Sequence, residues 1–557
     1  MGGGLLTNSR APHPLSREGR SASLSAMAKQ PPELLIVGGG ITGAGVARDA
    51  ALRGMSVALL EQTDFGAGTS SRSSKIIHGG VRYLEYLELS LVRESARERR
   101  VLRRLAPHLV HPLPFLFPVF RGESLLKIRA GLKLFDLLAG SPRGEWSRHL
   151  SPEGTRSYLP GLRDPLKGSV LYPEYITDDA RFTLANIASA VEHGARVANH
   201  ARVLGFLTEN GRVVGARVRD LEDDRELEIR AEITVNATGP WAEQTLVESG
   251  LSVPKPMVPS KGIHILFERE RLPLQAATFL KSSSGRPGLA MPRGPWVYVG
   301  TSDEEYVDDL DRPRATAVEA EELLELTRDC FPELGLESGD VKATWAGIRP
   351  LIREDGKSTR DTSRHDEIWT SPPGLVTIAG GKLTTYRPMA RRILKAVAAA
   401  RGRPLPGVER TDRVLLPGAP NEGLESFRDR MRVALSRRNV RGLTLDRIEY
   451  LYGTECEVLL DYGDEDPSWL LPLGPGVPAL RGEVRLAVER EMALTLEDVL
   501  DRRLALLLFG PGGGLEGAAE AAEIAGSRLG WSSDRRAREL ASYRILVREH
   551  GPPGRIR

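Results

Sequence analysis

At 557 residues and 60.9 kDa, the chain exceeds the usual size of one hydrophobic core, so two or three domains are expected. Hydrophobic residues make up 41% and charged residues 27%, which excludes global disorder, a fibrous protein and a multi-span membrane protein. Lysine and arginine (77) nearly balance aspartate and glutamate (74), and the net charge of +3 gives no reason to expect nucleic-acid binding.

The cysteines and the N-terminal composition describe the setting of the chain. Cys330 and Cys456 lie far apart and in no metal-binding pattern, so the sequence indicates neither a disulfide framework nor a metal site. A reducing, cytoplasmic setting fits best. The first thirty residues are rich in Gly, Ser, Arg and Pro and lack the apolar core of a signal peptide. We therefore expect a disordered tail over residues 1–32, with Met27 as an alternative start.

A dinucleotide-binding fingerprint follows this tail. The apolar run at residues 33–37 predicts a buried parallel strand, and it leads into the glycine motif GGGITG at residues 38–43. Small and apolar residues at helical spacing continue to Arg53, and residues 57–60 predict a second strand that ends at Glu61. Strand, glycine turn, helix, strand and acid in this order indicate a Rossmann-type nucleotide site.

Each glycine of the motif has a separate physical task. Gly38 makes the tight turn, Gly40 lets a pyrophosphate approach the backbone, and Gly43 lets the helix pack closely on the strand. The start of the helix presents backbone N–H groups and the positive end of the helix dipole to the phosphates. Glu61 would accept hydrogen bonds from ribose hydroxyls and repel a 2′-phosphate, which favours NAD or FAD over NADP.

Two later segments favour FAD over NAD. Residues 231–241 and 375–382 each predict a strand that ends in a small, glycine-containing turn, and the second opens a helix through residues 389–400. Three chain segments, separated by long insertions, thus add strands to one sheet. This arrangement is expected where one long ligand contacts the ends of several strands. FAD is therefore the expected cofactor.

Several further motifs carry a resemblance to a known family. They are GTSSRSSKIIHGGVRYLE at residues 68–85, PSKGIH at 259–264, GTSD at 300–303, AGIRPL at 346–351, SRH at 363–365 and GGKLTTYR at 380–387. Together with the glycine motif, they make the chain similar to the FAD-dependent, quinone-linked glycerol-3-phosphate dehydrogenases, within the D-amino-acid-oxidase-like flavoproteins. The resemblance extends from about residue 33 to near residue 543.

The resemblance implies an α/β fold with three parts. An FAD domain of the two-dinucleotide-binding type is interleaved with a substrate cap on an antiparallel sheet over residues 33–400, with cap segments at about 106–171 and 252–340. A linker at 401–420 and a C-terminal helical domain at 421–557 follow. The expected cofactor-binding residues are Gly38, Gly40, Ile41, Thr42, Gly43, Glu61, Thr69, Ser70, Ser71, Ser74, Lys75, Ala237, Thr238, Gly239, Gly381, Lys382, Leu383 and Thr384.

The C-terminal part shows a helical pattern. Residues 495–498 (TLED) resemble an N-terminal helix cap, and a Leu- and Ala-rich run to Phe509 follows. Residue chemistry assigns this part no role, and packing within the chain and homodimer formation both stay open.

Cations beside the glycine turns point to an anionic substrate. Arginine presents a planar fork that matches phosphate oxygens and lysine adds a point charge, so the group suits a phosphomonoester. The resemblance implies oxidation of sn-glycerol 3-phosphate to dihydroxyacetone phosphate, with a hydride passing from C2 to flavin N5. The substrate-binding residues that it implies are Arg82, Tyr83, Arg349, Arg364 and Lys382.

Loss of the hydroxyl proton needs a base, or a cation that stabilises the developing alkoxide. His264 is the expected base because histidine titrates near neutral pH and residues 263–267 read as a strand of the covering sheet. The alternative for His264 is a satisfied core histidine. Arg349 and Lys382 complete the expected catalytic set, and His78 and His365 are weaker candidates for the base.

Residues 125–135 form a basic amphipathic pattern beside an apolar loop at 112–120, which is typical of a helix on a membrane surface. Ordinary packing against the FAD domain explains the pattern equally well. The resemblance implies a peripheral enzyme on the inner face of the cell membrane that reduces a quinone. A glycerol-3-phosphate oxidase that uses oxygen and a catalytically silent flavin-binding sensor are the alternatives.

Overall fold

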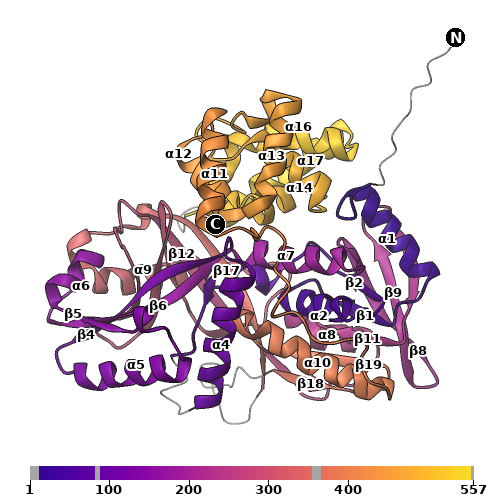
Figure 1. Cartoon of the computed structure of the whole chain (residues 1–557), viewed down its shortest axis with the longest axis horizontal. Helices are drawn as coiled ribbons and strands as arrows, with labels where there is room; N and C mark the ends of the chain where they lie inside the picture. The colour runs from indigo at the N-terminus through magenta and orange to yellow at the C-terminus, as the bar shows by residue number, and fades with distance from the viewer. Residues whose placement is uncertain (1–11, 82–87, 354–365, 553–557) are drawn as a thin grey trace.

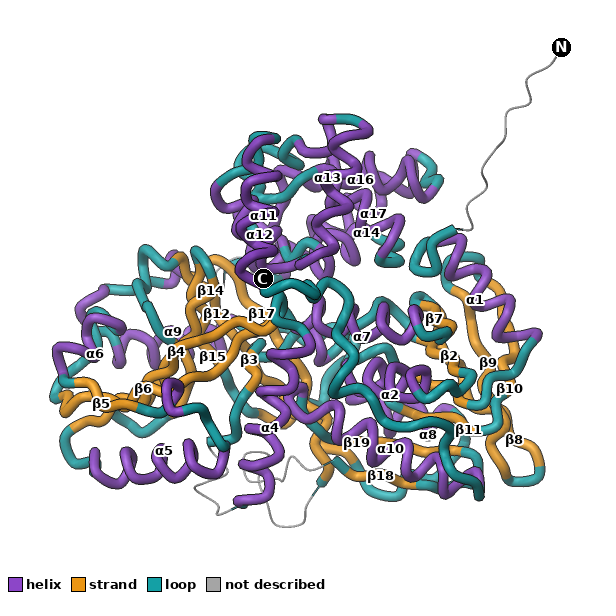
Figure 2. Tube along the Cα trace, viewed as in Figure 1, coloured by secondary structure: helices purple, strands orange, loops and turns teal. Residues whose placement is uncertain are grey.

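A computed structural model describes residues 12–81, 88–353 and 366–552 of the chain. Figure 1 shows a cofactor domain, a cap beside it and a C-terminal group of helices that stands over the junction of the two. The strands lie in the cofactor domain and the cap, whereas the C-terminal part is helical (Figure 2). The expected α/β fold with a cap and a C-terminal helical domain is confirmed.

The cofactor domain is built on a six-stranded sheet in the order β18-β19-β11-β1-β2-β7. Its strands are β1 (Leu34–Val37), β2 (Val57–Leu60), β7 (Arg196–Ala198), β11 (Ile233–Asn236), β18 (Glu367–Trp369) and β19 (Leu375–Ala379). All pairs are parallel except the edge pair of β18 with β19. The carboxyl ends of β1, β2, β11 and β19 therefore lie at one edge of the sheet. These are the four strands that the sequence predicts for the cofactor domain.

The two faces of this sheet are covered by different elements. Leu34 and Ile36 of β1 pack with helices α2 (Ile41–Leu52), α7 (Asp179–Glu192) and α10 (Tyr386–Arg401). Alternate residues of a strand face opposite ways, so Leu35 and Val37 pack on the other side. The elements on that side are α1 (Arg17–Lys29), α8 (Ala242–Glu248) and the antiparallel strands β8 (Ala201–Glu209), β9 (Arg212–Asp220) and β10 (Arg225–Arg230).

The expected disordered tail is wrong within residues 12–32, because residues 17–29 form helix α1. Leu24 and Met27 of this helix are fully buried. The buried Arg20 guanidinium donates to the carbonyl oxygens of Asn199 and His200 and to the Asp220 carboxylate, which lies 2.6 Å away. Composition does not predict this helix, because only one arginine and two apolar side chains attach it to the cofactor domain, and three residues change the composition of the segment little.

The cap is a ten-stranded sheet. Its strands are β3 (Ile76–Ile77), β4 (Val110–Phe120), β5 (Arg148–Leu150), β6 (Leu166–Thr177), β12 (Met257–Glu268), β13 (Ala277–Lys281), β14 (Pro287–Arg293), β15 (Trp296–Gly300), β16 (Glu304–Glu305) and β17 (Val341–Ile352). Its pairs are antiparallel except β13 with β4. β17 pairs with β12 along its length, so residues 341–352 belong to the cap sheet, whereas the sequence placed the end of the cap at 340.

Among the described residues, four helices accompany the cap sheet: α4 (Leu89–Leu105), α5 (Leu125–Ala139), α6 (Pro152–Tyr158) and α9 (Ala317–Cys330). α5 lies along the edge of the cap that is remote from the C-terminal helices (Figure 1). Within the described ranges, no helix has both the length and the apolar composition needed to cross a membrane.

The C-terminal domain contains α11 (Leu424–Arg437), α12 (Gly442–Leu451), α13 (Glu457–Glu465), α14 (Arg481–Arg490), α15 (Leu506–Phe509), α16 (Leu515–Leu529) and α17 (Ser533–Glu549). The helix cap predicted at 495–498 is present, since Thr495 Oγ1 accepts from the Asp498 N–H at 3.1 Å. The helix that follows is interrupted: residues 498–503 have π-helical geometry, and Ala505 has a left-handed backbone with φ of 54°.

Arg20→Ala should destabilise the protein, because the buried Asp220 carboxylate would lose its 2.6 Å ion pair and keep only the Glu222 N–H and a longer contact to Arg225. Breaking a buried ion pair costs about 3–5 kcal/mol of unfolding free energy, which urea denaturation would measure. The control is Arg230→Ala, which removes an exposed pair with Glu209 and should change stability little. Wild-type stability in Arg20→Ala would show that α1 does not support the sheet.

Candidate functional site

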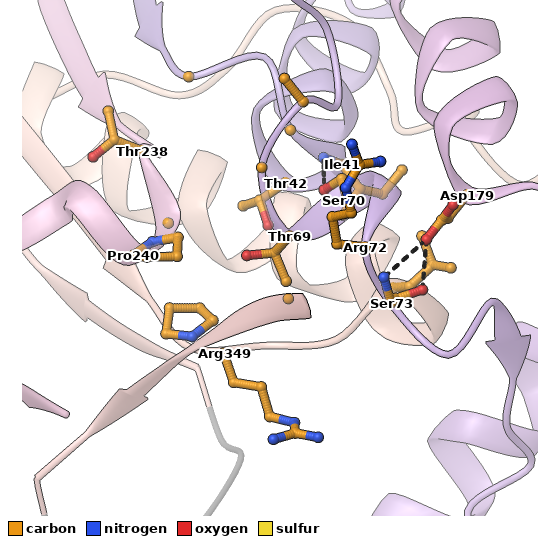
Figure 3. Close-up of a pocket in the computed structure, with 18 of the residues that line it drawn as sticks. Ile41, Thr42, Thr69, Ser70, Arg72, Ser73, Asp179, Thr238, Pro240 and Arg349 are labelled. Carbon is orange, nitrogen blue, oxygen red and sulfur yellow. Dashed lines mark hydrogen bonds between the residues drawn. The ribbon is translucent and has the colours of Figure 1, made fainter. Parts of the chain in front are cut away.

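The carboxyl ends of the parallel strands open into a cavity of about 990 Å³. The turns after β1, β2, β11 and β19 line it, together with cap strands β12 and β17 and part of the C-terminal domain. In Figure 3, Thr42, Thr69 and Ser70 lie on the side of the cofactor domain, and Arg349 lies across from them on a cap strand. The cavity therefore lies between the two parts that the sequence assigned to cofactor and substrate.

The glycine turn has the geometry that its sequence predicts. Gly38 has a φ of 108°, a conformation that favours glycine. A Cβ on Gly43 would overlap the carbonyl oxygen of Gly38, so only glycine lets α2 begin against β1. Gly40 lines the cavity, where a Cβ would come within 3.2 Å of Ser70 Oγ.

The loop between β2 and β3 makes hydrogen bonds to both sides of the cavity. Ser70 Oγ accepts from the Ile41 N–H at 2.9 Å, so this N–H at the start of α2 already has a protein partner. Thr69 Oγ1 donates to the Ile348 carbonyl oxygen of β17 at 2.6 Å. The short turn Thr69–Ser71 thus connects the cofactor domain to the cap sheet.

Glu61 lies at the end of β2, as expected for an acid that binds ribose. Its carboxylate accepts from the Gly39 N–H at 2.7 Å and from the Thr63 N–H at 3.0 Å. Burial raises the pKa of Glu61, and these two backbone donors offset that effect only in part. A further donor such as a ribose hydroxyl would stabilise the carboxylate, so the residue fits a dinucleotide.

Lys75, an expected cofactor contact, lines the cavity and is also held by a buried ion pair. Its buried ammonium lies 2.5 Å from Asp179 Oδ1 and donates to the Ser71 carbonyl oxygen at 3.0 Å. Asp179 also accepts from the Ser73 N–H and hydroxyl, at 3.2 and 2.7 Å. Asp179 and Ser73 therefore position this loop. Sequence reasoning missed Asp179, because no motif marks an acid at the start of α7.

Most other cofactor residues line the cavity. Of the expected set, Gly43 and Ser71 are the two that do not: Gly43 packs against Gly38, and the Ser71 side chain is buried within its own turn. Gly381, with a φ of 96°, shapes the turn after β19 that brings Lys382 to the cavity. Arg82, Tyr83 and Arg364 lie outside the described residues.

His264 lies in the cavity wall as a stacked, buried ring. It stacks on Trp345 with ring centroids 4.6 Å apart, and its Nε2 lies 2.9 Å from Ser74 Oγ. Burial, followed by the charges of Arg349 and Lys75, holds the pKa of His264 well below its usual range. The imidazole is therefore neutral at physiological pH.

The Arg349 guanidinium is held in a fixed place on β17. It donates to Thr301 Oγ1 at 2.8 Å and lies 3.3 Å from Asp303 Oδ1. A Cβ on Gly262 of the paired strand β12 would overlap this guanidinium. The glycine in the PSKGIH motif thus leaves room for Arg349 beside His264.

Sequence reasoning also missed the contribution of the C-terminal domain. Cavity residues from this domain include Thr495, Glu497, Asp498, Arg502, Arg538, Glu539, Ser542 and Tyr543. The helix N-cap motif TLED at residues 495–498 is a local signal for a helix start. Nothing in the sequence shows that this helix start lies beside the turn after β2.

Comparisons with known proteins agree with this site. Residues 33–387 match the family described as FAD dependent oxidoreductase, and residues 409–536 match the C-terminal domain of alpha-glycerophosphate oxidase. The aerobic glycerol-3-phosphate dehydrogenase of Bacillus subtilis is 37% identical over 515 residues, 89% of this chain and 91% of that protein. The glycerol-3-phosphate dehydrogenase of Mycobacterium leprae is 36% identical over 540 residues, 96% of this chain and 91% of that protein.

Among solved structures, the glycerol-3-phosphate dehydrogenase from Bacillus halodurans complexed with FAD is 32% identical, with a TM-score of 0.80. The match covers 97% of this chain and 99% of that chain. Fold and site thus define an oxidoreductase of the D-amino-acid-oxidase type, whose glycine turn, Glu61 and cavity fit FAD. The chain belongs to the FAD-dependent glycerol-3-phosphate dehydrogenase family, as the sequence motifs indicated.

Gly43→Ala should lower the FAD content of the purified protein, because the added methyl group pushes α2 away from β1. Flavin absorbance per chain measures this content. Gly339→Ala is the matched control, since nothing lies within 4 Å of a Cβ there, and it should keep full flavin. Full flavin in Gly43→Ala would contradict the close packing assigned to the turn.

Proposed function

We propose that this protein oxidises sn-glycerol 3-phosphate to dihydroxyacetone phosphate and delivers the electrons to a quinone. The observation that carries the proposal is the pair formed by the neutral His264 and the fixed Arg349 guanidinium on neighbouring cap strands, facing the FAD cavity. The names of the relatives point to the same substrate.

The side chains of this pair suit an alcohol that carries a phosphate. A guanidinium matches phosphate or alkoxide oxygens with its planar fork, and Lys382 adds a second cation from the turn after β19. His264 can take the hydroxyl proton as the C2 hydrogen leaves with its electron pair. FAD supplies the two-electron acceptor for that hydride when it is bound. Reduction of the quinone to a quinol then consumes two electrons and two protons.

The reaction is tested by adding glycerol 3-phosphate to the FAD-loaded enzyme without oxygen. We expect the flavin absorbance to bleach and dihydroxyacetone phosphate to form in equal amount. No bleaching would contradict the proposal and favour a flavin-binding sensor. Readmission of air or addition of a soluble quinone then identifies the acceptor: stoichiometric peroxide favours an oxidase, and preferential quinone reduction favours the dehydrogenase.

His264→Ala should slow this bleaching by about 10²–10⁴-fold, the usual contribution of a general base, and leave the FAD content normal. His149→Ala, which alters an exposed histidine of cap strand β5, is the control and should bleach at the wild-type rate. Wild-type bleaching in His264→Ala would remove this residue from the mechanism.

Helix α5 supports the further proposal that the enzyme lies on a membrane surface. Leu126 and Leu137 are 75% and 67% exposed, and Leu134 is 44% exposed. The exposed Lys127 and Arg129 lie on the same helix. Exposed leucines beside cations match a bilayer with anionic headgroups, where leucine enters the acyl boundary and cations meet phosphates. Binding to the bilayer surface would bring the enzyme close to a quinone dissolved in that bilayer.

Replacement of both Leu126 and Leu137 by Ser should weaken co-sedimentation with anionic phospholipid vesicles at low salt by about tenfold or more, because the buried apolar area is lost. In the control variant, Ser replaces Val433 and Leu443, which are 51% and 55% exposed on the C-terminal helices. This variant should sediment with the vesicles like the wild type. Equal sedimentation of both variants, or no vesicle binding by the wild type, would overturn the membrane proposal.

A further inference from the structure

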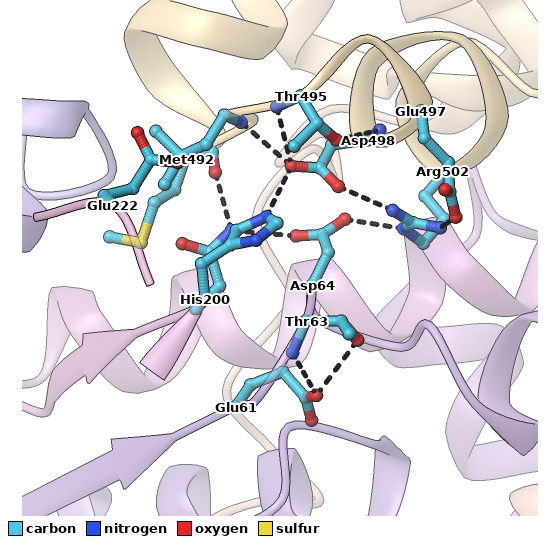
Figure 4. A network of polar contacts seen from close by, with 12 residues as sticks. Glu61, Thr63, Asp64, His200, Glu222, Met492, Thr495, Glu497, Asp498 and Arg502 are labelled. Atoms are coloured by element: carbon cyan, nitrogen blue, oxygen red, sulfur yellow. Dashed lines mark hydrogen bonds and ion pairs between the residues drawn. The ribbon is translucent and has the colours of Figure 1, made fainter. Parts of the chain in front are cut away.

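A buried ionic cluster joins the C-terminal domain to the loop that follows β2 (Figure 4). Asp64 of this loop is fully buried. Its carboxylate accepts from Arg502 Nε at 2.8 Å and from Arg503 Nη1 and Nη2 at 2.7 and 2.8 Å. Asn199 Nδ2 donates to it as well, at 3.0 Å. Two guanidiniums of the C-terminal domain thus converge on one carboxylate of the cofactor domain.

The two arginines are themselves fixed. Arg502 Nη2 donates to Asp498 at 2.6 Å, and Arg503 donates to the Glu491 carbonyl oxygen at 2.8 and 3.1 Å. Both side chains are at most 3% exposed. They are consecutive residues at the end of the π-helical turn 498–503. Single π-helical turns are rare and, where they occur, often lie at functional sites, and this one carries two neighbouring side chains that reach the same carboxylate.

The loop that carries Asp64 packs directly on the glycine turn. Gly66 donates its N–H to the Gly39 carbonyl oxygen at 3.0 Å, and Glu61 accepts from the Gly39 N–H at 2.7 Å. A Cβ on Gly39 would lie 2.9 Å from the ring of Phe65. Asp64 therefore lies between two direct contacts to the turn that receives the dinucleotide.

His200 makes a second connection between the C-terminal domain and the loop after β2. Its Nε2 lies 2.9 Å from Asp498 Oδ2, and its backbone N–H donates to the Thr63 carbonyl oxygen at 2.6 Å. Burial alone would lower the pKa of His200, but the carboxylates of Asp498, Asp64 and Glu222 raise it. In Figure 4, His200 and Asp64 lie between the C-terminal Asp498 and the cofactor-domain residues Thr63 and Glu61.

These contacts lead to one assignment beyond the reaction itself. We propose that Asp64, Arg502 and Arg503 are positioning residues for FAD: the C-terminal domain holds the loop from Glu61 to Gly66 against the glycine turn and so sets the affinity for the cofactor. Without the guanidiniums, a buried carboxylate lacks compensation, and the loop would carry Asp64 toward water together with Glu61. FAD would then have to order the loop as it binds, which weakens binding.

The test compares FAD binding in Arg503→Lys and Asp64→Asn with the wild type. Apoprotein is titrated with FAD, flavin fluorescence gives the Kd, and the melting temperature of each apoprotein is recorded. We expect the Kd to rise by about tenfold or more in both variants, a change of about 1.4 kcal/mol. The double variant should show little further weakening, because both substitutions break one interaction. Arg503→Lys keeps a cation, so it carries the test if Asp64→Asn does not fold.

Arg535→Gln is the matched control. Arg535 pairs with Glu222 at 2.9 Å across the same two domains, but its side chain is 26% exposed and it does not line the cavity. This variant should lower the apoprotein melting temperature and keep the wild-type Kd for FAD. A wild-type Kd in Arg503→Lys and Asp64→Asn, or equal weakening in Arg535→Gln, would overturn the proposal. The titration uses no substrate, so its result is independent of the proposed reaction.

Discussion

The first turn of α2 must lie against the end of β1, and the rest of the molecule is arranged around that contact. The turn is possible because Gly38 adopts a positive φ and Gly43 has no side chain to overlap it. With β1 in the middle of the sheet, the ends of β2, β11 and β19 come to the same edge. A long cofactor can then contact four chain segments at once, and the cap closes over the space that remains.

The parts of the fold that the sequence predicts are those where one residue type is physically required. Glycines at 38 and 43, and an acid at the end of β2, mark places where backbone approach or charge leaves little choice. His264, Arg349 and Lys382 were expected to act together, and all three line one cavity. Each belongs to a short motif that contains a glycine.

The parts that the sequence misses depend on partners from distant segments. The ion pair of Lys75 with Asp179, more than a hundred positions later in the chain, has no local signal in the sequence. α1 reads as a tail because its attachment depends on Asn199, His200 and Asp220. The contact of Arg502 and Arg503 with Asp64 spans more than four hundred residues, and local patterns carry no information on such pairs.

The interleaved connectivity has a consequence for biosynthesis. β1 pairs with β11 about two hundred residues later, and β11 pairs with β19 after a further long insertion. The central sheet is therefore incomplete until most of the chain has left the ribosome, and the two arginines on Asp64 emerge later still. A nascent chain that ends before β19 leaves one edge of β11 unpaired, which favours aggregation. The ion pairs that hold the loop beside the glycine turn form only after residues 502 and 503 have emerged.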